Sequence, residues 1–178
     1  MARVRLALLG VVVVAAACAS SPSSARHAQE TRAPLPAGRS PSKISKMVCA
    51  VDAQREIADA LGLKAVVQTP TWVQHRYSCR YTYPNGSFTL SVQELSSWSQ
   101  TVGYFRSLHS SLGDTGSVAN LGQGAFSTTD GSVVVRKDWK VLFVDITGLP
   151  SQFGVPPTSA SDVAVTVADV ILGCWDGD

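Results

Sequence analysis

The stretch HRYSCRYTYPNGSFTLSV, residues 75–92, decides the fold of this chain. In its first half, 75–83, Tyr and Cys side chains alternate strictly with Arg, Ser and Thr side chains. This pattern predicts a β-strand that has one face formed by Tyr77, Cys79, Tyr81 and Tyr83. Asn85-Gly86 is a strong hairpin signal, because both central residues of the favoured two-residue turn need positive φ. The returning strand adds three apolar side chains to the buried face: Phe88, Leu90 and Val92. The stretch therefore predicts an antiparallel hairpin with one apolar face.

A helix is predicted on each side of this hairpin. Upstream, apolar side chains keep to one side from Cys49 to Leu61, and a short strand-like piece follows over 64–68. Downstream, Ser96 or Ser97 caps a second helix, which carries apolar side chains at helical spacing as far as residue 112. Both helices would pack against the sheet to which this hairpin belongs.

Three more strands and a third helix are predicted in the last third of the chain. The strands are expected over 125–128, 132–136 and 140–147, and the last two are apolar enough to be central strands covered on both faces. Ser159 and Asp162 resemble a capping box at the start of a helix over 163–172. The predicted fold class is α+β, an antiparallel sheet of about five strands packed by two to three helices in the order α-β-β-α-β-β-β-α.

The first seventeen residues have the pattern of a secretory signal peptide. Two arginines precede an apolar run over 6–14, and a helix over 6–17 would be roughly 18 Å long, too short to cross a bilayer core of about 30 Å. Three alanines then lead to Cys18, as in a lipoprotein signal, so Cys18 is the predicted lipidation site. The alternative is cleavage by an ordinary signal peptidase, which would leave Cys18 unmodified.

Lipidation would define three parts of the chain: a signal peptide over 1–17, a lipidated Cys18 with a disordered tether over 18–46, and one domain over 47–178. The tether is rich in Ser, Pro, Ala and Arg and has few large apolar residues, so it would not offset its ordering entropy. Palmitate and further acyl chains on Cys18 would hold the protein at the extracytoplasmic face of the cell membrane, because two or more chains anchor firmly.

The formal net charge of +2 hides an uneven distribution. Residues 19–46 carry five basic side chains and one acidic one, whereas the chain from Met47 onward carries eight basic and twelve acidic side chains. The basic tether either lies near anionic headgroups or is simply a solvated linker. The acidic domain has no basic, aromatic-interleaved face, which argues against nucleic acid as a partner.

Three cysteines remain beyond Cys18: Cys49, Cys79 and Cys174. Outside the membrane a disulfide is expected, and the odd number leaves one thiol over. The stabilisation expected from loop entropy is similar for a Cys49–Cys79 and a Cys49–Cys174 disulfide, so it does not choose between them. The sequence favours Cys49–Cys79, because Cys79 shares the tyrosine face that a helix should cover.

No catalytic motif or cofactor-binding fingerprint is found in the sequence, so no cofactor is expected. The candidate acid–base residues are His75, His109 and Asp145, each of which is more often structural. Four tryptophans could line a ligand groove or serve in packing: Trp72, Trp98, Trp139 and Trp175.

Several short motifs occur in a distinctive order: Cys49, Leu61-Gly62, Cys79-Arg80-Tyr81, Leu121-Gly122-x-x-Ala125, Val133-Val134-Val135-Arg136 and Lys140-Val141-Leu142-Phe143-Val144. In this order they resemble the small actinobacterial lipoproteins that carry a domain of unknown function. The resemblance implies an exported lipoprotein with an α+β domain, similar to PsbP-like folds, and it supplies no catalytic residue.

These observations predict a membrane-anchored, non-enzymatic module that binds a cell-envelope component or a partner protein. The expected binding surface is either the sheet face bearing Arg76 and Arg80 or a cleft edged by Trp72 and Trp139. The alternative is a small cell-envelope enzyme that uses His75 or His109 with Asp145, which requires two of these side chains to lie together.

Overall fold

The computed structural model describes residues 34–175, so the predicted signal peptide, Cys18 and the tether as far as residue 33 lie outside the described residues. Four helices are found in the described range: α1 (Lys43–Met47), α2 (Val51–Leu61), α3 (Trp98–Leu112) and α4 (Ala160–Trp175). The strands of the main sheet are β1 (Val66–Val67), β2 (Thr71–Val73), β3 (Arg76–Tyr83), β4 (Gly86–Glu94), β5 (Asp114–Ser117), β6 (Gly124–Thr128), β7 (Val133–Lys137) and β8 (Lys140–Asp145). A small separate sheet contains β9 (Gln152–Phe153) and β10 (Thr158–Ser159).

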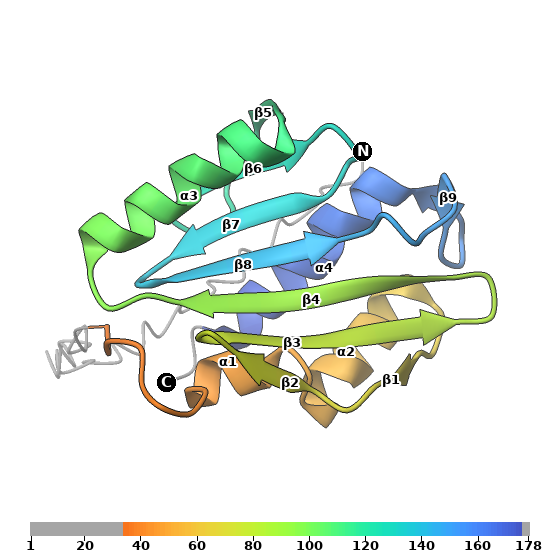
Figure 1. Ribbon diagram of the computed structural model, residues 1–178. Coiled ribbons are helices and arrows are strands. Elements are labelled where there is room, and N and C mark those ends of the chain that lie inside the picture. The colour runs from red at the N-terminus through yellow and green to blue at the C-terminus, as the bar shows by residue number, and fades with distance from the viewer. Residues whose placement is uncertain (1–33, 176–178) are drawn as a thin grey trace, which may run out of the picture. The chain divides into compact units, whose positions relative to one another are not determined.

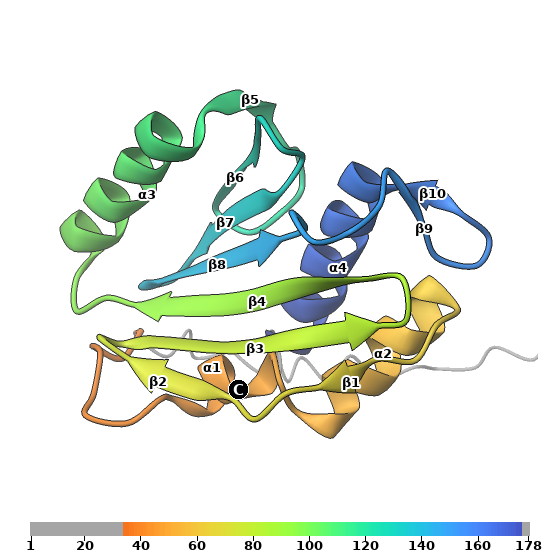
Figure 2. The ribbon, with the colours of Figure 1, turned by 45° about the vertical axis from the view of Figure 1, so that its right-hand side comes forward.

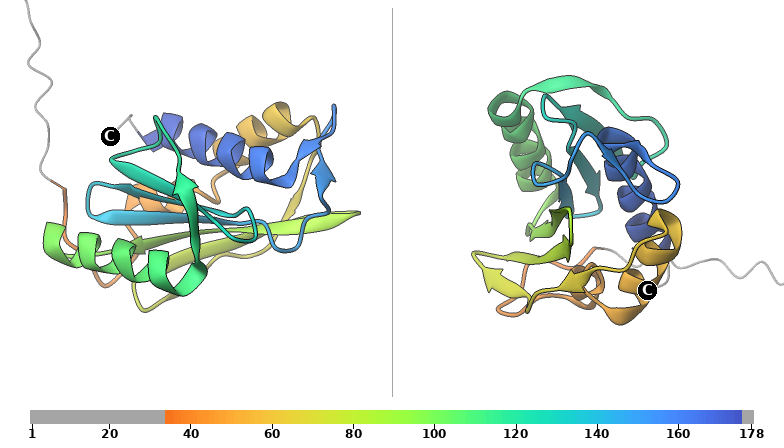
Figure 3. Two further views of the ribbon diagram at one scale, coloured as in Figure 1. Left: turned by 90° about the horizontal axis from the view of Figure 1, so that it is seen from above. Right: turned by 90° about the vertical axis from the view of Figure 1, so that its right-hand side faces the viewer.

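The main sheet is antiparallel, with the order β1-β3-β4-β8-β7-β6-β5 and β2 paired to β3 beside β1. Helices α1, α2 and α4 lie on one side, called the inner face, and α3 lies on the other, the outer face (Figures 1 and 3). The predicted α+β class is therefore correct. The main sheet has eight strands rather than about five, because the short strands β1, β2 and β5 extend its two edges (Figure 2).

The main core fills the space between the inner face and α2 and α4. Its largest fully buried side chains include Tyr81, Phe88, Leu142 and Ile171. Burying each such side chain contributes roughly 1.5–3 kcal/mol, which makes this layer the chief source of stability.

A smaller cluster lies under α3 on the outer face. Its buried members are Phe126, Val134 and Val141. Strands β7 and β8 alternate between the two clusters, since Val133 and Leu142 belong to the main core. The prediction that these strands are covered on both faces is confirmed.

The hairpin of β3 and β4 is confirmed, but its turn differs from the predicted one. Tyr83 pairs with Gly86, so the loop residues are Pro84 and Asn85, and neither Asn85 nor Gly86 has a positive φ. Gly86 is required for space instead, because a Cβ atom there would lie 2.9 Å from the Gly148 carbonyl oxygen.

A turn with positive φ lies at the opposite end of β3. Gln74 and His75 have φ values of 51° and 60° between the paired residues Val73 and Arg76. These values fit a two-residue turn of type I′, the turn that matches the twist of paired strands. His75 is thus a turn residue, and the strand predicted from 75 begins at Arg76.

The segment 34–46, predicted as the end of the tether, contacts the domain. Ala37 N donates to Leu95 O, and the buried Ser45 Oγ donates to the buried carboxylate of Glu94. The same carboxylate accepts from Ser42 N at 2.8 Å, just before α1 begins. The folded domain therefore includes residues upstream of 47.

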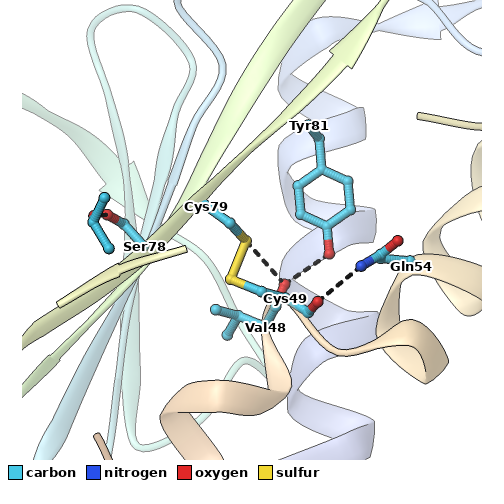
Figure 4. Close-up of a disulfide and its surroundings, with 7 residues drawn as sticks. Val48, Cys49, Gln54, Ser78, Cys79 and Tyr81 are labelled. Atoms are coloured by element: carbon cyan, nitrogen blue, oxygen red, sulfur yellow. Dashed lines mark hydrogen bonds between the residues drawn. A yellow bond between two sulfur atoms is a disulfide. The ribbon is translucent and has the colours of Figure 1, made fainter. Parts of the chain in front are cut away.

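A disulfide joins Cys49 to Cys79, as the sequence favoured, with a Cα–Cα distance of 6.0 Å. Beside it, Tyr81 Oη donates to Val48 O at 2.7 Å and Gln54 Nε2 donates to Cys49 O at 2.8 Å (Figure 4). The bridge connects the start of α2 to the inner face of β3. Cys174 is a free, half-buried thiol on α4.

Candidate functional site

The outer face of β3 and β4 is a polar surface that α3 leaves open. α3 packs over β6, β7 and β8, whereas β3 and β4 extend past it (Figures 1 and 3). The register aligns the outward side chains of the two strands in rows: Arg76 with Gln93, Ser78 with Ser91, and Arg80 with Thr89. The result is a surface of hydroxyl, amide and guanidinium groups, called here the open face.

Arg76 is exposed and held in position by neutral groups. Its Nη2 donates to Tyr104 Oη at 2.7 Å, and its Nε donates to Gln93 Oε1 at 3.3 Å. Gln93 is fixed in turn, because its Nε2 donates to Gln74 O at 2.9 Å. No carboxylate of the described residues pairs with this guanidinium.

Arg80 is also exposed and also bonds to a neutral group. Its Nε and Nη2 donate to Ser87 Oγ at 3.1 Å and 2.6 Å. Arg80 follows Arg76 by four positions on the same strand, which corresponds to about 13 Å. Two oriented cations therefore project from one face, and within residues 34–175 neither is neutralised by an acidic side chain.

A shallow cleft of about 140 Å³ lies between the open face and α3. Its polar rim consists of Arg76, Ser91, Gln93 and Tyr104. Its apolar floor and wall consist of Leu108, Leu112, Val141 and Phe143. The cleft thus places a fixed cation beside apolar side chains.

A larger hollow of about 670 Å³ lies beside α2, between that helix and the segment after it. It is wide open and lined by small, apolar and charged side chains, among them Arg55, Asp59 and Lys64. Arg55 is already paired with Asp52 at 2.9 Å. Among residues 34–175, no charged side chain of this hollow is held in place by hydrogen bonds to neutral groups, as Arg76 and Arg80 are. The open face is therefore the stronger candidate for a binding site.

Charge is divided between the two sides of the sheet. Helices α1, α2 and α4, on the inner side, carry five acidic side chains and three basic ones: Asp52, Glu56, Asp59, Asp162 and Asp169, with Lys43, Lys46 and Arg55. The open face carries Arg76 and Arg80 and, at its border, Asp145. The acidic average of the domain therefore does not describe the open face.

Trp72 and His75 contact the N-terminal end of the described range. Trp72 Nε1 donates to Arg39 O at 3.1 Å, and its ring meets His75 edge-on, with 5.8 Å between centroids. His75 Nδ1 bonds to Gly38 O at 3.0 Å. Trp139 lies in the turn between β7 and β8. Trp72 and His75 thus hold the N-terminal segment.

The three candidate acid–base residues do not bond to one another. His109 Nδ1 bonds to Asp114 Oδ2 at 2.7 Å, and its ring stacks on Phe126 with 3.8 Å between centroids. The Asp145 carboxylate accepts from Thr147 Oγ1 at 2.7 Å. His75 bonds to the N-terminal segment. Within residues 34–175, each of these three side chains therefore has a different direct hydrogen-bond partner.

Sequence reasoning did not single out Tyr104 or Arg136. Arg136 stacks on Trp98 with 4.3 Å from its guanidinium carbon to the ring centroid, and its Nη2 donates to Gln123 O. This stack fastens the start of α3 to β7. Tyr104 and Arg136 become notable only through contacts between elements far apart in the sequence.

No family model, curated protein or solved structure matches this chain. Within residues 34–175, no helix is both long enough and apolar enough to cross a membrane. The same residues contain no group of three or more His, Cys, Asp or Glu side chains placed to hold a metal ion.

Proposed function

We propose that this protein is a non-enzymatic binding module, anchored to the extracytoplasmic face of the cell membrane, and that its open face binds an anionic component of the cell envelope. The observation that carries the proposal is the pair Arg76 and Arg80. Both guanidinium groups are exposed, oriented and bonded only to neutral partners. A ligand anion could accept hydrogen bonds from them without displacing an internal carboxylate, and charge-assisted hydrogen bonds are the stronger kind.

The anchoring part of the proposal is supported by the sequence of the first eighteen residues. Lipidation at Cys18 would keep the domain at the membrane surface, where envelope polymers are concentrated. Mass spectrometry and membrane fractionation of Cys18→Ala test this part. Loss of the acyl mass and release into the soluble fraction support it, and unchanged membrane retention overturns it.

The binding part is tested by titrating the full chain with poly(glycerol phosphate), and with dextran as an uncharged polymer of similar length. We expect binding of the polyanion alone, weakening as salt is raised. Arg76→Gln and Arg80→Gln should each weaken binding by about tenfold or more, since one charge-assisted hydrogen bond contributes about 1.5–3 kcal/mol.

Arg55→Gln is the matched control, because Arg55 is an exposed arginine on α2, on the inner side of the sheet. It should bind the polymer like the unmodified chain. Equal binding of dextran, or full binding by the Arg76→Gln/Arg80→Gln double variant, would overturn the proposal. Binding of an acidic protein in place of the polymer would likewise refute the envelope ligand.

A further inference from the structure

We infer that the Arg76 end of the open face selects one kind of anion, an organic phosphate or carboxylate that carries a short apolar group. The anionic end would bind Arg76, and the apolar group would enter the cleft between β8 and α3. This inference rests on the proposed function, because it takes the open face to be the ligand-binding surface. It adds the chemical class of the ligand.

The position of Arg76 supports the anionic half of this ligand. Tyr104 and Gln93 hold the guanidinium at the rim of the cleft. A planar guanidinium that is fixed in this way can present its remaining N–H groups to two oxygens of one phosphate or carboxylate. Ser91, on the same rim, supplies a hydroxyl for a further hydrogen bond.

The cleft wall supports the apolar half. Leu108, Leu112 and Phe143 are only half-buried, so apolar surface stays in contact with water directly beside a cation. Covering that surface is favourable in proportion to the apolar area removed from water. A purely polar anion would leave this contribution unused.

Arg80 has no comparable neighbourhood. The outward side chains around it are polar, with Thr89 opposite and Ser87 bonded to its guanidinium. It can attract an anion, but it offers no apolar surface to an attached group. The two arginines therefore differ in role: Arg80 contributes charge, and Arg76 contributes charge together with selectivity.

The cleft also limits the size of the apolar group. Its volume of about 140 Å³ is close to that of a protein cavity of about 150 Å³ that binds benzene. A group of a few carbons fits, and a longer chain must extend into solvent. Affinity should therefore rise with chain length and then level off.

The experiment titrates the full chain with methyl, propyl, pentyl and heptyl phosphate, and with pentanol as the uncharged analogue. We expect affinity to increase by about fourfold for each methylene that enters the cleft, and then to become constant. Pentanol should not bind. Pentyl phosphate should also displace poly(glycerol phosphate) from the chain if both use Arg76.

Two matched pairs of variants locate the site. Ser78 and Ser91 are cross-strand partners on the open face, but only Ser91 lines the cleft, so Ser91→Leu should remove the chain-length dependence and Ser78→Leu should keep it. Arg76→Gln should abolish binding of pentyl phosphate, whereas Arg80→Gln should weaken it no more than about threefold. Unchanged circular dichroism of each variant confirms that it folds.

Equal affinity for methyl and pentyl phosphate would overturn this inference. Loss of chain-length dependence in both serine variants would overturn it as well. If the polymer still binds through Arg76 and Arg80 in that case, the proposed function stands without the cleft. If neither the polymer nor any alkyl phosphate binds, both proposals fail.

Discussion

Removing the Cys49–Cys79 disulfide tests the account of how this domain is held together. The suitable change is Cys49→Ala/Cys79→Ala in a Cys174→Ser background. That background is needed because the free thiol of Cys174 could otherwise attack the Cys49–Cys79 disulfide of the control chain during unfolding. The Cys174→Ser chain with its disulfide intact is the matched control.

The expected loss of stability follows from the loop that the bridge closes. The sequence separation of 30 residues corresponds to about 3–4 kcal/mol of unfolded-state entropy at 25 °C. The native contacts at the junction remain, since the bond from Tyr81 Oη to Val48 O does not depend on the sulfur atoms. Because a small domain is stable by only about 5–15 kcal/mol, the variant should stay folded but unfold at a much lower urea concentration.

Urea titration followed by tryptophan fluorescence measures both parts of this expectation. The midpoint should fall, and the slope m should rise, because an unfolded chain without the cross-link exposes more surface. A loss of less than about 1 kcal/mol with an unchanged slope would refute the loop-entropy reasoning. Such a result would mean that residual structure already restrains the unfolded chain near this junction.

Further outcomes are expected at Cys174, Glu94, Gly62 and Asp130. The pKa of the Cys174 thiol is raised to about 11, first by burial and then by the hydrogen bond and the charge of Glu56. Because the thiolate is the reactive form, iodoacetamide at pH 8 should alkylate Cys174 on the order of a hundredfold more slowly than an ordinary thiol. Glu56→Gln should lower that pKa and speed the alkylation, as mass spectrometry of the quenched samples would show. Glu94→Gln should destabilise the domain by about 1–3 kcal/mol in urea titration, because the buried carboxylate accepts two charge-assisted hydrogen bonds from the residues around the start of α1. Gly62→Ala should cost about 1–3 kcal/mol in the same assay, since φ there is 63° and a Cβ atom would meet a backbone oxygen. Burial disfavours the Asp130 carboxylate, but hydrogen bonds from neighbouring Thr and Ser groups outweigh burial and hold the pKa of this carboxyl below its ordinary value. Its stabilising contribution is therefore present above about pH 3.9 and is lost as the pH falls through the lowered pKa. In urea titrations, the stability advantage of the chain over Asp130→Asn should shrink as the solution is acidified and then become independent of pH.

The strongly periodic elements could be predicted from the sequence because their side chains meet one continuous core. The alternation of Tyr77, Cys79, Tyr81 and Tyr83 reflects a strand with one face against α2, and the disulfide followed from the same face. Helix α3, the second of the predicted helices, has its N-cap at Ser97 and ends at Leu112, as the spacing of its apolar side chains indicated.

Two short elements, β5 and α1, lack such a signal. All four residues of β5 are exposed, and a register shift interrupts its pairing with β6. In α1 only Ser45 is buried, and its partner Glu94 lies 49 residues further along the chain. Periodicity reports burial on one face, so the fully exposed β5 and the helix α1, which is held by one distant carboxylate, leave no pattern in the sequence.

The candidate site could be predicted only in part, for a related reason. Alternation along a single strand is enough to place Arg76 and Arg80 on the same outward face. The cleft depends on Tyr104 and Leu108 of α3 lying beside Val141 of β8, which is a contact between distant elements. Local sequence gives the direction of a side chain within its own strand, but not which helix will lie next to it.

The separation of charge makes it reasonable that a domain with more acidic than basic residues binds an anion. The acidic side chains of α2 and α4 lie on the inner side, so the sheet and a helix of about 10 Å in diameter separate many of them from the open face. At physiological salt the potential of an exposed charge decays over about 8 Å. An anion approaching the open face therefore meets mainly the field of Arg76 and Arg80. Asp145 lies at the border of that face, and the hydrogen bonds that its carboxylate accepts from Thr147 do not cancel a carboxylate charge, so it opposes the two arginines.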